Sequence, residues 1–252
     1  MAVLETDGLV RQFGELVAVD HVDLSVEAGE FRCVIGPNGA GKTTLFNLIS
    51  GALSPTDGTI RFDGEDVSQL PPNERVRRGI GRSFQITTVF GGLSVRENVR
   101  LATQSAMDET ITAGDRFFRS SDSFPDVEER VEDVLGRVEL ADRADETAAA
   151  LAYGDRRRLE IGLVLATDPK VVLLDEPTAG MSVEETEATM ELVADVLSER
   201  TLLLIEHDID MVMNVSDRIT VLDRGQELAT GTPEEVAANE DVQDAYLGGG
   251  GH

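Results

Sequence analysis

The stretch Gly36-Pro37-Asn38-Gly39-Ala40-Gly41-Lys42-Thr43 decides the fold of this 252-residue chain. It matches the P-loop pattern G-x-x-x-x-G-K-[ST], in which glycines let successive backbone N–H groups turn toward phosphate oxygens. In that pattern Lys42 reaches the β- and γ-phosphates, and the hydroxyl of Thr43 binds Mg²⁺. The stretch therefore predicts a site for a nucleoside triphosphate. The alternative is a glycine-rich turn that contains Lys-Thr by chance.

The residues on either side of the loop support the nucleotide-binding interpretation. Phe31-Arg32-Cys33-Val34-Ile35 has the composition of a buried strand that enters the loop. Thr44 to Ser50 has the pattern of a helix that leaves the loop and ends before Gly51. This order presents a helix N-terminus to the phosphates.

A second constellation is Val171-Val172-Leu173-Leu174-Asp175-Glu176, an apolar strand that ends in two consecutive acids. An α/β fold places such carboxylates at the edge of the sheet where ligands bind. Beside a P-loop, Asp175 is expected to hold the shell of Mg²⁺, and Glu176 to orient or deprotonate the attacking water. The alternative is a pair of solvated acids at the end of a strand.

The rest of the chain predicts two kinds of sheet. From Leu9 to Phe31 apolar and polar residues alternate between turn signals, which predicts antiparallel strands, and Thr59 to Gly64 adds another. Val171 to Leu174 and Thr201 to Ile205 are short apolar runs that flank a helix from about Val183 to Glu199. Runs of this kind predict a parallel sheet that is covered on both faces.

Helical periodicity dominates from about Leu93 to Ala166, which indicates a helical insertion between the two halves of the sheet. A closing hairpin is expected from Arg218 to Asp223 and from Gln226 to Ala229. A polar helical tail and the glycine run Gly248 to Gly251 follow it.

The charge balance excludes some partners. The chain has 48 acidic and 22 basic residues, a net charge of −26, and its only lysines are Lys42 and Lys170. Binding to free nucleic acid or to anionic lipid depends on lysine and arginine, so neither is expected. The acid excess favours adaptation to a cytosol of molar salt, where screening weakens self-repulsion. An ordinary acidic protein in dilute buffer is the alternative.

Two further observations concern the compartment. No apolar stretch approaches the roughly 18 residues of a transmembrane helix, and Glu5 and Asp7 stand where a signal peptide would be basic and then apolar. A cytosolic location is expected. Cys33 is the single cysteine, and its place in an apolar strand predicts a buried, inert thiol.

Five ordered motifs resemble the ATP-binding cassette ATPases of ABC transporters, from roughly Leu4 to Leu247. They are Gly36 to Thr43, Gln85, Leu151-Ala152-Tyr153-Gly154-Asp155, Asp175-Glu176-Pro177-Thr178 and His207. The resemblance implies that ATP binds at Phe13, at Gly36 to Thr43 and at Thr44, and that Phe13 stacks on adenine. It implies that Gln85 reaches Mg²⁺ or water and senses a membrane partner, and that His207 contacts the γ-phosphate.

The resemblance also implies the architecture. It predicts an α/β fold with a P-loop NTPase core of the RecA-like type, an antiparallel β subdomain and an inserted helical subdomain. A single cassette would span 4–247. Its core would comprise 1–92 and 167–232, its helical subdomain 93–166, and its C-terminal tail 233–252.

In this family the signature segment Leu151 to Asp155 and the D-loop Ala179-Gly180-Met181-Ser182 act across a dimer. The segment leads into Arg156-Arg157-Arg158, so the helix that follows offers its N-terminus to an anion. That anion is implied to be the nucleotide of a second subunit. The chain has one P-loop and one signature, so the resemblance implies dimerisation with itself or with a paralogue.

Four residues depart from the usual family pattern. The signature usually has Leu-Ser-Gly-Gly-Gln, whereas this chain has Ala152, Tyr153 and Asp155 at its second, third and fifth positions. Ser182 stands where the D-loop usually has aspartate. These departures leave open whether the serine contact to the γ-phosphate and the cross-dimer contact have substitutes here.

Several sequence segments resemble those of importer ATPases for branched-chain and other hydrophobic amino acids. They include Gly79 to Gln85, Arg156 to Gly162 and Asp241 to Gly248. The implied partners are integral-membrane permeases and, indirectly, a solute-binding protein, with the cassette held on the inner face of the cell membrane. Urea importers and lipopolysaccharide exporters carry similar phrases, so the solute and the direction of transport stay open.

A soluble cassette ATPase that acts on ribosomes, DNA or iron–sulfur assembly is the alternative class. Such proteins often join two cassettes, carry a coiled-coil arm or display basic patches, and none of these features is evident in this sequence. Val89 to Leu93 offers apolar side chains directly after Gln85, as a permease interface would. The alternative is that Phe90 and Leu93 pack inside the helical insertion.

Overall fold

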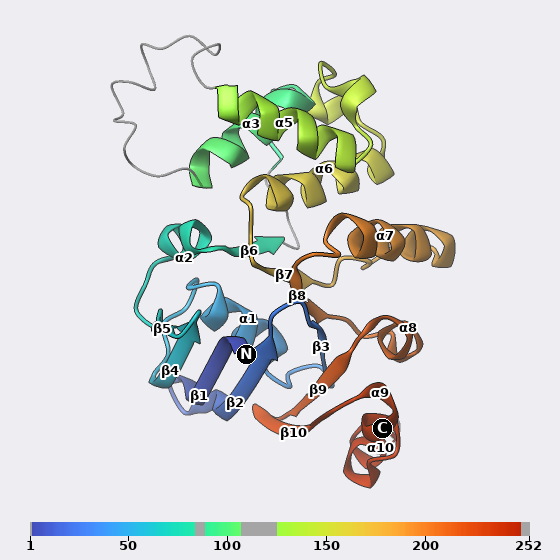
Figure 1. Ribbon diagram of the computed structural model, residues 1–252. Coiled ribbons are helices and arrows are strands. Elements are labelled where there is room, and N and C mark those ends of the chain that lie inside the picture. Colours follow the sequence, from blue (N-terminus) through green and yellow to red (C-terminus); the bar gives the residue numbers. More distant parts are fainter. Residues whose placement is uncertain (1, 84–88, 107–124, 248–252) are drawn as a thin grey trace.

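A computed structural model describes residues 2–83, 89–106 and 125–247, and Figure 1 shows how their helices and strands are arranged. Gln85 and the run Gly248 to Gly251 lie outside the described residues. Two sheets form the lower part of the molecule as drawn, and a layer of helices lies above them (Figure 1). No helix in the described ranges is long and apolar enough to cross a membrane.

The first sheet is antiparallel and has the strand order β2-β1-β4-β5. The predicted alternation from Leu9 is part of a longer strand that begins at Ala2, because Val3 and Leu4 also face the core. Gly14 has a φ of 59°, a conformation that glycine adopts without strain, and it turns the chain into the second strand. The strands are β1 (Ala2–Phe13), β2 (Leu16–Glu27), β4 (Asp57–Phe62) and β5 (Glu65–Asp66).

The second sheet has the strand order β10-β9-β3-β8-β7-β6, and all neighbouring pairs are parallel except β9 with β10. The strand that enters the P-loop, β3, lies in the middle. The strand with the two acids, β7, is separated from it by β8 alone. The strands are β3 (Phe31–Ile35), β6 (Ile80–Ser83), β7 (Val171–Asp175), β8 (Thr201–Ile205), β9 (Arg218–Asp223) and β10 (Gln226–Gly231).

The parallel sheet separates two hydrophobic cores. Side chains alternate between the two faces of a strand, so consecutive residues of β7 enter different cores. Leu173 packs with the antiparallel sheet and the helix after the P-loop, whereas Leu174 packs with the helices on the other face. Both side chains are buried. Burial on both faces explains why Val171–Leu174 of β7 and Leu202–Ile205 of β8 are continuously apolar and do not alternate with polar residues.

Helices cover both faces of the parallel sheet, as expected. Helix α2 is an addition to the prediction: Pro71-Pro72 looks like a turn, but Pro72 occupies the first helical position, where the missing N–H costs nothing. Helix α7 ends at Val196, three residues before the predicted end, because Arg200 N–H bonds Leu197 O in a turn that leads into β8. These helices are α1 (Lys42–Ile49), α2 (Pro72–Arg78), α7 (Val183–Val196), α8 (Ile209–Val215), α9 (Pro233–Ala237) and α10 (Glu240–Leu247).

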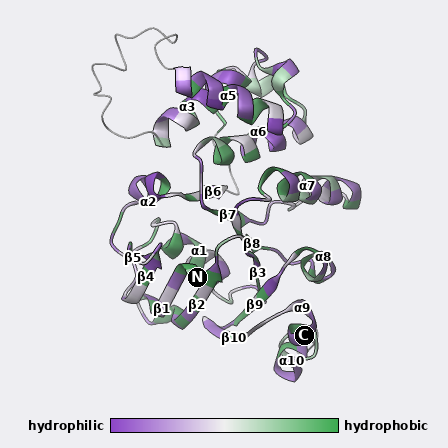
Figure 2. Cartoon of the chain, in the orientation of Figure 1, coloured by the Kyte–Doolittle hydropathy of each residue, from purple (hydrophilic) through white to green (hydrophobic). Residues whose placement is uncertain are grey.

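The predicted helical insertion forms a separate layer above the sheets (Figure 1). It contains α3 (Val95–Ala106), α5 (Pro125–Arg137) and α6 (Tyr153–Ala166), with two short 3₁₀ turns at Ala141–Arg143 and Ala148–Ala150. Its apolar residues join the same core as α7 and one face of the parallel sheet. Figure 2 shows hydrophilic residues interleaved with hydrophobic ones along α5 and α7. The layer is therefore amphipathic, with one side packed on the body of the molecule.

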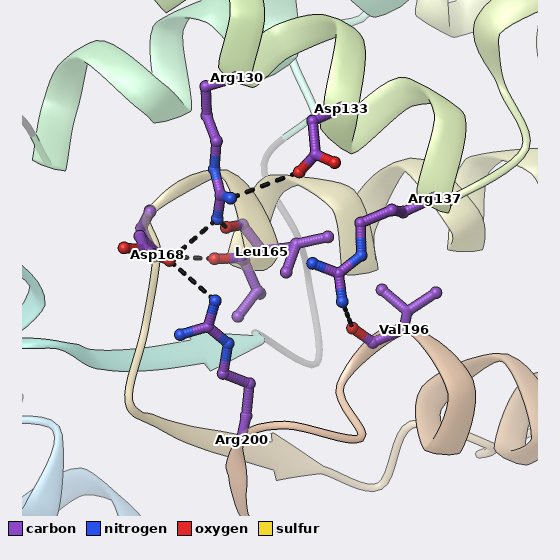
Figure 3. Close-up of polar contacts among 9 residues, drawn as sticks. Arg130, Asp133, Arg137, Leu165, Asp168, Val196 and Arg200 are labelled. Carbon is purple, nitrogen blue, oxygen red and sulfur yellow. Dashed lines mark hydrogen bonds and ion pairs between the residues drawn. The ribbon is translucent and has the colours of Figure 1, made fainter. Parts of the chain in front are cut away.

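Arginine side chains attach this layer to the body at the end of α6 (Figure 3). Arg130 of α5 donates to Leu165 O at 2.6 Å and to Asp168 at 3.2 Å. Arg200, which precedes β8, donates to the same Asp168 carboxylate at 2.9 Å. The guanidinium group of Arg137 donates to Val196 O at 2.5 Å and so joins α5 to the end of α7. One carboxylate thus receives an arginine from each side of the junction.

The thiol of Cys33 lies fully inside the sheet. Burial raises its pKa to about 12, so the thiolate does not form at neutral pH. The prediction of a buried cysteine is confirmed.

Candidate nucleotide site

The P-loop backbone requires glycine at two positions. Gly36 has a φ of 151°, and a Cβ there would lie 2.1 Å from Leu222 O. Gly41 has a φ of 101°, and a Cβ there would lie 2.3 Å from Ala18 O. Any larger residue would collide with the neighbouring backbone. These two glycines let the loop lie close against β2 and β9 and end at the first residue of α1.

Lys42 begins α1 and folds its side chain back over the loop. Its Nζ donates to Gly36 O at 2.7 Å and to Pro37 O at 3.2 Å, and the residue is 6% exposed. Burial lowers the pKa of this ammonium group, while the negative charges of Glu176 and Asp175 oppose that shift. The ammonium group therefore sits in the loop before any phosphate is present.

The opposite end of α1 is closed by an arginine that no sequence motif indicates. Arg75 of α2 is 1% exposed and donates to Leu48 O at 2.6 Å and to Ile49 O at 2.7 Å. It also donates to Ser68 O and Leu70 O. Burial lowers its pKa to about 10. A cation that satisfies the last carbonyls of a helix also complements the negative end of the helix dipole.

Asp175 ends β7 and has an arginine partner that the sequence analysis missed. It is 3% exposed, and its Oδ2 accepts from Arg82 at 3.0 Å. The other nitrogen of the Arg82 fork donates to Asn47 at 2.7 Å and to Ser50 at 3.0 Å, both at the end of α1. Arg82 thus links the acid on β7 to the helix after the P-loop.

Glu176 and His207 meet at the end of neighbouring strands. His207 Nε2 lies 2.6 Å from Glu176 Oε1. Glu176 has a φ of 46°, a conformation that costs a residue with a side chain about 1–2 kcal/mol, and its N–H bonds Ile205 O at 3.0 Å. This left-handed turn directs the chain away from the sheet immediately after the acid pair.

A buried glutamate that was not predicted holds the two loops together. Glu206 is 4% exposed, and its Oε1 accepts from the Thr178 hydroxyl at 2.7 Å and from the Thr178 N–H at 3.1 Å. Its position directly before His207 fixes the distance between the loop after β7 and the loop after β8.

Lys42, Glu176 and His207 line one cleft of about 320 Å³, whereas Asp175 is not among its lining residues. Phe13 forms part of its wall with a 42% exposed ring, and Arg11 lies over that ring at 4.5 Å from its centroid. The structure therefore brings together Phe13, the loop and the acid–histidine pair as expected. The residues that line the cleft are Phe13, Leu16, Ala18, Asn38, Gly39, Ala40, Gly41, Lys42, Thr43, Thr44, Glu176 and His207.

The signature segment is not part of this cleft. Helix α6 begins at Tyr153, which is 58% exposed, and Ala152 precedes it without a side-chain cap. Asp155 pairs with Arg143. Tyr153 and Gly154 instead line a smaller cavity of about 160 Å³ between α6 and α7, together with Met181.

The D-loop also lies outside the nucleotide cleft, and its unusual serine has a local structural role. Ser182 is the N-cap of α7: its hydroxyl accepts from the Glu185 N–H at 3.3 Å, and the Glu185 carboxylate accepts from the Ser182 N–H at 2.9 Å. Ser182 and Glu185 therefore form a reciprocal capping box at the start of α7.

Comparison with known proteins gives two family matches. Residues 19–179 match the model described as ABC transporter. Residues 226–252 match the model described as branched-chain amino acid ATP-binding cassette transporter. The first match covers more than half of the chain.

Curated relatives match nearly the whole length. The high-affinity branched-chain amino acid transport ATP-binding protein BraF of Pseudomonas aeruginosa is 42% identical, with 98% of each chain covered. LivG of Escherichia coli, described in the same words, is 41% identical over the same shares. The lipopolysaccharide export system ATP-binding protein LptB of Haemophilus influenzae is 32% identical, again with 98% of each chain covered.

Solved structures agree with this likeness. The crystal structure of the ADP conformation of an ATP-binding cassette of an ABC transporter has a TM-score of 0.83 and 32% identity, and covers 98% of this chain and 99% of its own. A dimeric cassette bound to ADP and Pi in a post-hydrolysis state has a TM-score of 0.72 and 25% identity, with 91% and 98% covered.

Proposed function

The chain belongs to the ABC transporter family as an ATP-binding cassette ATPase, and from this premise we propose that it powers the import of branched-chain amino acids. The geometry that carries the mechanism is the Glu176–His207 pair at 2.6 Å in the same cleft as Lys42. The similarity to BraF and LivG, and the C-terminal match at 226–252, support the substrate class.

ATP is proposed to bind across the cleft with its adenine on Phe13 and its phosphates in the P-loop. The backbone N–H groups of the loop and the start of α1 contact the phosphate oxygens. Lys42 exchanges its two carbonyl contacts for the β- and γ-phosphates, which offer charge-assisted hydrogen bonds to the ammonium group. Because Lys42 is already held in the loop, little ordering is required of it.

The oxygen donors of Thr43 and Asp175 fit a magnesium ion. Among the described residues no group of three or more His, Cys, Asp or Glu forms a cage, which suits an ion that uses one or two carboxylates and completes its shell with substrate phosphates and water. Asp175 Oδ2 is held by Arg82, so Oδ1 remains for the ion. Gln85 is the third proposed ligand. Bound there, Mg²⁺ would neutralise charge on the β- and γ-phosphates.

Glu176 is proposed to act as the general base. It takes a proton from water as the water oxygen bonds to the γ-phosphorus, and the bond from that phosphorus to the bridging oxygen breaks to release ADP. In the structure His207 holds the Glu176 carboxylate. We propose that His207 turns to the γ-phosphate when ATP enters, and that Glu176 then binds water.

The complete site is proposed to form between two cassettes, either two copies of this chain or this chain and a paralogue. Leu151 to Asp155 and the D-loop Ala179 to Ser182 lie outside the cleft of their own chain, as segments that serve a partner would. The solved cassette bound to ADP and Pi is described as dimeric, which supports this arrangement.

The helical layer is proposed to contact integral-membrane permease subunits, which would hold the cassette at the inner face of the membrane. Phe90 is 55% exposed, and its backbone is fixed by the buried side chain of Asn98, which accepts from the Phe90 N–H at 2.8 Å. An exposed aromatic on a fixed backbone suits an interface core. A solute-binding protein would deliver the amino acid from the other side.

The division of labour within the cassette follows from these assignments. Residues 1–92 and 167–232 would form the catalytic core, 93–166 the helical signature subdomain, and 233–252 the tail. The acidic surface is proposed to be an adaptation to molar salt, since acids outnumber bases by more than two to one.

The Glu176→Gln variant tests the proposed mechanism. ATP turnover should fall by about 10²–10⁴-fold while ATP binding is retained, because the amide keeps the shape but cannot take the proton. Glu184→Gln, at an exposed acid in the first turn of α7, is the matched control and should be active. Near-normal hydrolysis by purified Glu176→Gln would remove Glu176 from the base role.

The substrate class needs a transport measurement. The cassette should drive ATP-dependent uptake of leucine, isoleucine and valine when it is reconstituted with its permeases and solute-binding protein in vesicles. Urea is the comparison solute, and outward movement of lipopolysaccharide is the comparison for an exporter. Transport of either of these without amino acid uptake would contradict the proposal.

A further inference from the structure

Three consecutive arginines follow the signature segment, and each has a different partner. Arg156 donates to Ala149 O at 3.4 Å, and Arg158 pairs with Glu139; both partners belong to the helical layer. Arg157 reaches in the other direction and donates to Pro177 O at 2.6 Å. Among the described contacts of these arginines, this one alone joins the start of α6 to the loop that carries Glu176.

The Arg157 contact is built to persist. The side chains of Arg157 and Glu160 are each 14% exposed, and the second nitrogen of the Arg157 fork binds Glu160 one turn along α6. Glu160 therefore holds the guanidinium in one orientation while the other nitrogen meets Pro177 O. Planar arginine forks lose little freedom in such paired contacts.

The peptide that receives this contact is next to the proposed base. Glu176 is held in a left-handed conformation, with its N–H on Ile205 O and its carboxylate on His207. A residue in that conformation is retained only where its surroundings fix it from several sides. Pro177 O faces α6, and Arg157 donates a hydrogen bond to it.

The far end of α6 is attached separately. Arg130 and Arg200 hold Asp168, and Arg130 also holds Leu165 O, so that end is fixed to the body of the molecule (Figure 3). The helix has 14 residues and is therefore about 21 Å long. Small rotations about the Asp168 end would move the Tyr153 end most, and Arg157 lies one turn from that end.

We propose that Arg157 is a positioning residue for Glu176, which it holds through Pro177 O from the signature end of α6. Arg157 is not among the residues that line the nucleotide cleft. Its role rests on the proposed function, because it acts through the base assigned there. A change in the position of α6 when a partner's nucleotide contacts the signature would then reach the base of the same chain.

The test compares Arg157→Gln with the neighbouring variants Arg156→Gln and Arg158→Gln. All three remove one positive charge from the same helix turn, but only the first removes the contact to Pro177. Turnover by Arg157→Gln should fall at least about tenfold with KM for ATP and Tm near wild type, since misplacement of a catalytic group by about 1 Å can cost up to 10²-fold. The two neighbours should retain turnover.

A conservative variant protects the test against misfolding. Arg157→Lys keeps one donor but loses the fork, so its turnover should lie between those of wild type and Arg157→Gln. Wild-type turnover in both Arg157 variants, or an equal loss in all three glutamine variants, would overturn the proposal.

A double variant shows whether Arg157 acts through Glu176. In the Glu176→Gln background, Arg157→Gln should change the residual turnover by less than about twofold, because the group it positions is already gone. The same tenfold loss in that background would overturn the proposal. The Glu176→Gln variant alone tests the base assignment, so failure of the proposed function is recognised separately.

Discussion

Helices α1 and α6 each present an N-terminus proposed for phosphate, yet their surroundings differ. Helix α1 begins with the buried Lys42, faces Glu176 and His207 across a cleft, and has its far end closed by Arg75. Helix α6 begins at the exposed Tyr153, with Ala152 before it and no side-chain cap. The N-terminus of α1 has a cation, an acid and a histidine beside it in the same chain. The N-terminus of α6 has no such set.

This difference indicates which half of the site a single chain can supply. The α1 end carries a cation and faces the proposed base and a histidine, so we expect it to bind ATP in the isolated chain. The α6 end has no side-chain cap, and we propose that it meets a nucleotide held by a partner. Variants at α1 should therefore affect binding by the isolated chain, whereas variants at α6 should affect only the closed pair.

Removal of the cation at α1 should give the largest effect. Lys42→Ala deletes a charge-assisted contact to phosphate, and ATP affinity of the isolated chain should fall by roughly 100-fold or about 3 kcal/mol. Equilibrium binding of a fluorescent ATP analogue measures this change. Lys170→Ala removes the other lysine, which is exposed and pairs with Asp63, and should bind normally. Equal ATP affinity of the two variants would contradict the role of Lys42 in phosphate binding.

The next largest effect is expected when the C-terminal end of α1 loses its Arg75 contacts. Arg75→Met removes the side-chain donor from the carbonyls of Leu48, Ile49, Ser68 and Leu70, of which Leu48 O keeps the Gly51 N–H, so the free energy of unfolding should fall by about 3 kcal/mol. For a chain of this length that is a decrease in Tm of about 6–12 °C. Arg77→Met, at an exposed position of the same helix, is the control. Matching melting curves would show that α1 does not depend on this closure.

The response of Tm to salt should distinguish the contribution of the charged surface from that of the buried Arg75 contacts. The acid excess lies on the surface, where repulsion acts over about 10 Å at 0.1 M salt and about 3 Å at 1 M. Tm should therefore rise by several degrees between these KCl concentrations, while the fall in Tm caused by Arg75→Met stays nearly the same. A flat or falling Tm of the wild-type chain would contradict the adaptation to molar salt and leave the ATPase assignment unchanged.

The smallest effect is expected from a repair of the α6 end. Ala152 already has the extended conformation of an N-cap residue, with φ −61° and ψ 162°. In Ala152→Ser the hydroxyl can accept from an N–H of the first turn, and the unfolding free energy should rise by about 1 kcal/mol. Urea unfolding measures this change, and ATP binding by the isolated chain should not respond. A change in that binding would show that α6 already contributes to the site of its own chain.

The fold was predictable where single residues carry backbone requirements. The two P-loop glycines, the apolar runs of β7 and β8 and the helical period of the insertion all follow from local geometry. Helix α2 was missed because Pro71-Pro72 marks a turn as readily as a helix start. The family resemblance gave the motif positions, and the structure places Phe13, Lys42, Glu176 and His207 around one cleft.

The arginine contacts were not predictable. Arg75, Arg82 and Arg157 each reach a partner that is distant in the sequence, and nothing in the local pattern distinguishes them from solvated arginines. Ser182 gave a misleading signal of a different kind. It departs from the usual D-loop, but Glu185 three residues later completes a capping box that is visible in the sequence.

The scarcity of lysine makes the occupancy of the cleft readable by chemical labelling. Lys170 is on the surface, whereas Lys42 lies in the loop with a lowered pKa, so a larger share of its amine is unprotonated and nucleophilic at mild pH. An amine-directed acylating reagent small enough to enter the cleft would have two side chains to choose between. Bound nucleotide should protect Lys42 from the reagent, while Lys170 serves as an internal standard. The labelling of Lys42 relative to Lys170 in a peptide map would then give the fraction of sites that hold nucleotide.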